Sequence, residues 1–83
     1  MIKEITQLAG VLGQPDVTEL SVLLSDIENA LLAKTITEHD YADLMVDVER
    51  LKKIIALRKN LELNQLIHDA VLGLIELAKA VKL

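Results

Sequence analysis

Residues 63 to 83 place an apolar side chain at alternating steps of four and three, a spacing typical of a helix that packs along its whole length. This seam contains Leu63, Ile67, Ala70, Leu74, Leu77 and Val81. A second stripe contains Val71, Ile75 and Ala78, and a third contains Leu66, Gly73 and Ala80. A helix that is apolar around so much of its circumference is either central in its own bundle or shared with another molecule.

The other apolar residues also favour helices. Hydrophobic residues make up 52% of the chain, but a single tyrosine is its only aromatic residue, so the core must be built from aliphatic side chains. Such a mixture suits helices better than sheets. Because 83 residues can enclose only one small core, we expect a single helical domain over residues 1–83.

Local signals predict two helices in the first half of the chain. Apolar spacing indicates a short helix over residues 2–12, which Gly13 would terminate and Pro15 could not continue. Asp16 and Glu19 have the spacing of a capping box, so a second helix should cover residues 17–33.

A third helix should begin after Thr37, with Asp40 completing a capping box and Ile36 and Tyr41 forming a hydrophobic staple. Its seam continues through Leu44, Val48, Leu51 and Ile55. A break near Asn60 would make the third and fourth helices an antiparallel hairpin, whereas its absence would leave one helix of roughly 45 residues. We expect an all-α bundle with one short N-terminal helix and three longer ones, in which this hairpin is the main unit.

The segment LLAKTITEHDYADLM resembles the short helical-hairpin module called SHOCT, in which a helix, a small turn, Ile-Thr and an acidic capped helix with an aromatic residue recur. Lys34 and Thr35 stand where that module usually has a glycine. Any capped helix with a hydrophobic staple would carry the same residues, so we attribute the similarity to shared physics.

The two histidines are each followed by an aspartate, a pairing that raises the question of a metal or acid–base site. In an antiparallel hairpin His39 and His68 would lie roughly 20 Å apart along the bundle axis, and in one long helix roughly 43 Å apart. Metal ligands lie about 2 Å from their ion, so one chain cannot bring both histidines to one site. His39 and Asp43 share a helical face, but two ligands do not make a site.

Charge is distributed in blocks, with nine acids and one base in residues 16–49 and five bases and no acid in residues 50–59. The stripe of Asp40, Asp43 and Asp47 is a candidate acidic face. The basic run forms a collar around the helix, lacks aromatic residues for stacking and belongs to a chain of net charge -4. A nucleic-acid-associated accessory protein is therefore the least favoured function.

No arrangement of nucleophile, base and oxyanion donor is visible, and cysteine is absent. We therefore expect no enzymatic activity, no small-molecule substrate, no metal and no cofactor. Absence of cysteine, of an apolar leader and of a long uncharged segment favours a cytoplasmic protein with no membrane partner.

The function that the sequence favours is protein–protein interaction or self-association through the C-terminal helix, either as a homo-oligomer or with another protein. The expected contact residues on that helix are Leu66, Gly73, Leu74, Ile75 and Ala78, with Gly73 allowing close approach. The alternative is a small acidic regulator or inhibitor whose aspartate stripe binds a basic protein surface.

Overall fold

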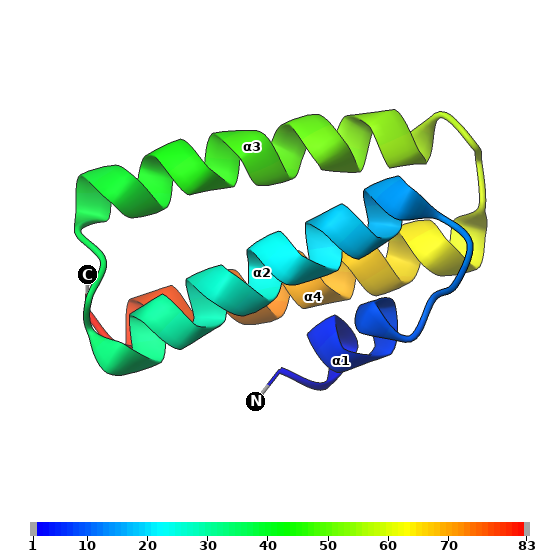
Figure 1. Cartoon of the computed structure of the whole chain (residues 1–83). Helices are drawn as coiled ribbons and strands as arrows, with labels where there is room; N and C mark the ends of the chain where they lie inside the picture. Colours follow the sequence, from blue (N-terminus) through cyan, green and yellow to red (C-terminus); the bar gives the residue numbers. More distant parts are fainter. Residues whose placement is uncertain (1, 83) are drawn as a thin grey trace.

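The computed structural model describes residues 2–82 and contains four helices (Figure 1). These are α1 (Lys3–Ala9), α2 (Pro15–Ala33), α3 (Glu38–Ala56) and α4 (Leu61–Ala80). Residues 2–82 contain no strand, and the molecule measures 34 × 22 × 18 Å. The all-α bundle of one short and three longer helices is confirmed.

Helices α2 and α4 are the central elements, because each contacts the other three helices. Helices α3 and α4 run antiparallel about the turn before Asn60, while α3 packs more extensively on α2 than on α4. Helix α1 contacts α2 and α4 on the side opposite α3 (Figure 1). The helices thus form three layers, with α2 and α4 between α1 and α3.

One aliphatic core joins all four helices. Its fully buried large side chains include Leu8 of α1, Leu20, Leu24, Ile27 and Leu31 of α2, Val48 and Ile55 of α3, and Ile67 and Leu74 of α4.

The structure corrects the expected start of the second helix. Gln14 is the N-cap of α2, but its side chain makes no capping hydrogen bond, and Pro15 occupies the first turn, so the capping box expected at Asp16 and Glu19 is wrong. Proline suits this place because its missing N–H would have no intrahelical partner and its fixed φ is already helical. The Asp16 carboxylate instead accepts the Val17 N–H at 2.9 Å and bonds Arg58.

Helix α1 is also shorter than expected. It ends at Ala9, where the Gly10 N–H donates to the Gln7 carbonyl at 3.1 Å, so the expected boundary at residue 12 is wrong. Gly13 lies in the connection to α2 with φ of 77°, a left-handed conformation that favours glycine.

The junctions on either side of α3 follow the local signals. The Asp40 N–H donates to the Thr37 hydroxyl at 3.1 Å, which confirms Thr37 as the N-cap of α3. Among the described residues, no bond from the Thr37 N–H to the Asp40 carboxylate completes the expected capping box. Helix α3 ends at Ala56, and the Asn60 side chain caps α4 by accepting the Leu63 N–H at 3.1 Å. The alternative of one continuous helix is therefore excluded.

Candidate interaction surfaces

The contact residues expected on α4 divide into buried and half-buried groups. Leu74 is fully buried in the chain's own core and Ala78 is nearly so, while Leu66 and Ile75 are half-buried. Gly73 does allow a close approach, but its neighbour is Ile2 of the same chain: an added Cβ would lie 3.1 Å from Ile2 Cγ2. Much of the apolar circumference of α4 is thus covered by α1, α2 and α3.

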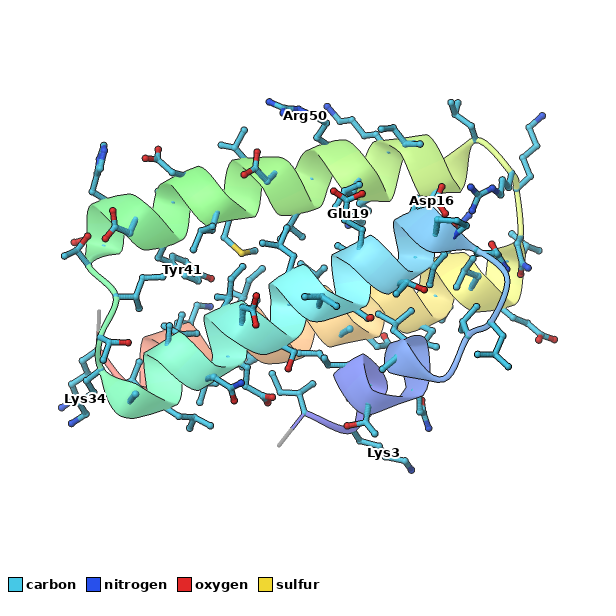
Figure 2. The ribbon with its side chains drawn as sticks, in the orientation of Figure 1. Lys3, Asp16, Glu19, Lys34, Tyr41 and Arg50 are labelled. Carbon is cyan, nitrogen blue, oxygen red and sulfur yellow. The ribbon has the colours of Figure 1, made fainter. Side chains whose placement is uncertain are left out.

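Ile75 and Ala78 line a groove of about 280 Å³ between α3 and α4. Tyr41 and Glu38 of α3 and Lys79 of α4 complete its lining. Figure 2 shows Tyr41 pointing from α3 toward the rest of the bundle. Burial raises the pKa of the Tyr41 phenol above its ordinary value, because the ionised form loses hydration there.

A larger groove of about 460 Å³ lies between α2 and α3. Apolar Val22, Leu23 and Leu51 line it together with the carboxylates Glu19, Asp26 and Asp47. Arg50 is the one cation among the described residues of this groove, and its guanidinium lies 3.6 Å from the Asp47 carboxylate. The groove therefore combines apolar side chains with a negative charge excess.

The expected acidic face of Asp40, Asp43 and Asp47 is exposed along α3. Of the three, only Asp47 is among the described residues that line the α2–α3 groove. Its carboxylate neighbours there are Glu19, which was expected only as part of a capping box, and Asp26, to which no sequence pattern pointed. Their seven-residue spacing places both on one face of α2, but only the position of α3 shows that this face meets Asp47.

The histidines do not form a shared site. His39 Nε2 lies 3.3 Å from Asp43 Oδ2 on α3, and both side chains are largely exposed. His68 is exposed on α4, where the neighbouring Asp69 accepts a hydrogen bond from Gln65 at 2.9 Å. Residues 2–82 contain no cluster of three or more metal-ligating side chains.

Arg58 ties together the two connections at one end of the bundle. Its guanidinium donates to Gln14 Oε1 at 3.0 Å and forms an ion pair with Asp16. The hydrogen bond and charge of Arg58 lower the pKa of the Asp16 carboxyl below its ordinary value. Two arginines of the basic collar, Arg50 and Arg58, are therefore engaged within the chain.

Three leucines beside these connections are the most exposed large apolar residues of the described chain, between 79% and 87% accessible: Leu12, Leu57 and Leu61. Leu12 belongs to the α1–α2 connection, Leu57 follows α3 and Leu61 begins α4.

Comparison with known proteins gave no match to a family model, to a curated protein or to a solved structure. The resemblance of residues 31–45 to the helical-hairpin module therefore does not extend to a family assignment. None of the four helices is long and apolar enough to cross a membrane, as judged over the described residues.

Proposed function

We propose that this protein is a small, non-enzymatic interaction module that self-associates, with α3 at the centre of its contact surface. The proposal rests on the incomplete burial of α3. Within Glu38–Ala56, all of which the structure describes, only Val48 and Ile55 are fully buried among the large apolar residues. The half-buried residues are Tyr41, Leu44, Met45 and Leu51.

The outer side of the same helix adds further apolar area. Val46 is 58% exposed and Ile54 48% exposed, and Leu57 directly follows the helix. Single exposed apolar residues are ordinary in soluble proteins, but several along one outer helix favour a contact surface. On the inner side of α3, Ile75 and Ala78 of α4 line a separate groove with Tyr41.

The solution mass tests this proposal. Light scattering after size exclusion, over a hundredfold range of protein concentration, should give a mass that rises above the 9.2 kDa of one chain. Val46→Asp should lower this mass, because it places a charge among the exposed apolar side chains of α3. Leu72→Asp is the matched control, since Leu72 is also about half-exposed but lies on α4. A mass of one chain at every concentration would contradict self-association.

The α2–α3 groove favours a second candidate function, the docking of a basic segment of another protein. Its three carboxylates exceed its one arginine, and its apolar side chains could receive aliphatic groups. Binding of a lysine-rich amphipathic peptide should weaken steeply with salt, and Glu19→Gln with Asp26→Asn should weaken it further. Binding that is insensitive to both would contradict this second function.

A further inference from the structure

The charges of α3 are separated by sign along its length. Every acidic residue lies between Glu38 and Glu49, and every basic residue lies between Arg50 and Lys53, with Arg58 and Lys59 following the helix. We propose, on the basis of the self-association proposed above, that two copies pair antiparallel along the outer faces of α3. The acidic half of each helix then lies over the basic half of the other.

The helix dipole explains only part of this charge order. It favours acids in the first turn, here Glu38 and Asp40, and bases in the last turn, here Lys53. The effect falls off within one turn, so it does not account for Asp43 and Glu49 before the sign change or for Arg50 after it. The pair of Arg50 with Asp47 on the same helix accounts for those two residues. Charge complementarity with an antiparallel copy accounts for the order of acids before bases along the rest of the helix.

The outer face of α3 has a shallow hollow where the sign changes. It occupies about 470 Å³ and is lined by Ala42, Met45, Val46, Glu49, Arg50 and Lys53. Figure 2 shows Arg50 pointing away from the bundle on this side of α3. The hollow thus combines three apolar residues with one acid and two bases on one side of α3, where Met45 is half-buried and Arg50 also pairs with Asp47.

A two-fold axis near Glu49 and Arg50 makes this face complementary to itself. Residues equally far from the axis then meet, so that Ala42 faces Leu57 and Glu49 faces Arg50 of the second copy. A parallel pair would instead place acids over acids and bases over bases, which costs free energy. With the axis there, residues 43–56 of the two copies of α3 overlap. At 1.5 Å per residue they provide a contact about 21 Å long, which fits a weak dimer better than a permanent one.

Charge reversal on the outer face tests the pairing. The acid-reversed chain carries Asp43→Lys and Glu49→Lys, and the base-reversed chain carries Arg50→Glu and Lys53→Glu. Each chain alone would place like charges across the axis, so its dimer dissociation constant should rise at least about tenfold. A one-to-one mixture should recover a dimer that contains one copy of each, because the reversed charges are again opposite.

Charge reversals outside α3 serve as controls, because they change the net charge by the same amount without altering the proposed contact. Asp69→Lys with Glu76→Lys repeats the charge change of the acid-reversed chain on α4, and Lys3→Glu with Lys82→Glu repeats that of the base-reversed chain. Both controls should dimerise as the wild type does. Circular dichroism verifies that each variant is folded, and if a double variant unfolds, Asp43→Lys and Lys53→Glu are compared singly and mixed.

The outcomes distinguish this pairing from the function on which it rests. A wild-type dimer whose reversed variants dimerise equally well would overturn the α3 pairing but leave self-association intact. Folded reversed variants that stay monomeric even when mixed would overturn the antiparallel arrangement. A wild-type chain that is monomeric at every concentration would overturn the proposed function and the pairing together.

Discussion

Ile2 packs over Gly73 so closely that a β-carbon at residue 73 would lie 3.1 Å from Ile2 Cγ2. The Ile2 backbone N–H also donates a 2.6 Å hydrogen bond to the buried Glu28 carboxylate. The residue before α1 is therefore held on α4 by close packing and on α2 by this hydrogen bond. The other Glu28 oxygen has no hydrogen-bond partner among residues 2–82, so this single bond is the main compensation for burying the carboxylate.

A double-mutant cycle should measure this close approach. Gly73→Ala gains about 1 kcal/mol of helix propensity but forces the Ile2 side chain to shift. In an Ile2→Ala background the added methyl meets no such side chain, so Gly73→Ala should be more stabilising there by about 0.5–1 kcal/mol. Urea unfolding of the four chains gives the coupling. Equal effects of Gly73→Ala in both backgrounds would show that the two residues are independent.

Leu74 and Leu72 should respond differently to truncation, although they lie two residues apart on α4. Leu74→Ala removes a fully buried side chain and should lower the free energy of unfolding by about 2–5 kcal/mol. Leu72→Ala is the matched control, because its side chain is 48% exposed and should cost less than about 1 kcal/mol. Urea unfolding measures both. A stable Leu74→Ala variant that loses only self-association would return Leu74 to the role in a contact surface that the sequence suggested.

Local signals were sufficient for much of the fold because they act over three or four residues. The start of α3 depends on a hydrogen bond from the Asp40 N–H to the Thr37 hydroxyl, three residues away. The break near Asn60 likewise depends on its side chain, which accepts the Leu63 N–H and so caps α4. The same reasoning failed at Asp16, since Pro15 begins α2 earlier and leaves that carboxylate to Arg58.

The candidate interaction surfaces could not be predicted in the same way, because they depend on how the helices pack together, and the apolar spacing of the sequence does not determine that packing. The apolar stripes on α4 indicated that several other helices must pack around it. They did not show that α1 is one of those helices, because the seven residues of α1 carry too little periodicity to define an apolar face. Gly73 was expected to admit a partner, whereas the side chain that lies over it is Ile2, from the other end of the same chain. Glu19 and Asp26 join Asp47 only because α3 packs along α2.

Tyr41 should report on the α3–α4 groove, because it is the chain's only tyrosine. Burial raises its pKa, so the phenolate absorbance should appear at a higher pH than in the urea-unfolded chain. A raised folded-state pKa stabilises the fold below the ordinary value of 10.0, and this contribution is lost as the pH rises through the folded-state value. Ile75→Ala should open the groove and lower the pH midpoint of the Tyr41 titration in the folded chain, whereas Leu72→Ala should leave that midpoint unchanged. Identical midpoints in folded and unfolded chains would contradict the burial of this side chain.

The Arg58–Asp16 ion pair should make stability depend on acid pH. Arg58 lowers the folded-state pKa of Asp16, so the pair's contribution is present above the ordinary value of 3.8 and is lost as the pH falls through the folded-state value. The stability difference between wild type and Asp16→Asn, measured by urea unfolding, should therefore be constant near neutral pH and shrink below about pH 4. The control is the same Asp16→Asn comparison made in an Arg58→Gln background, where the Asp16 carboxylate no longer has its arginine partner. The pH dependence should then largely disappear, and its persistence without Arg58 would show that another group lowers the pKa of Asp16.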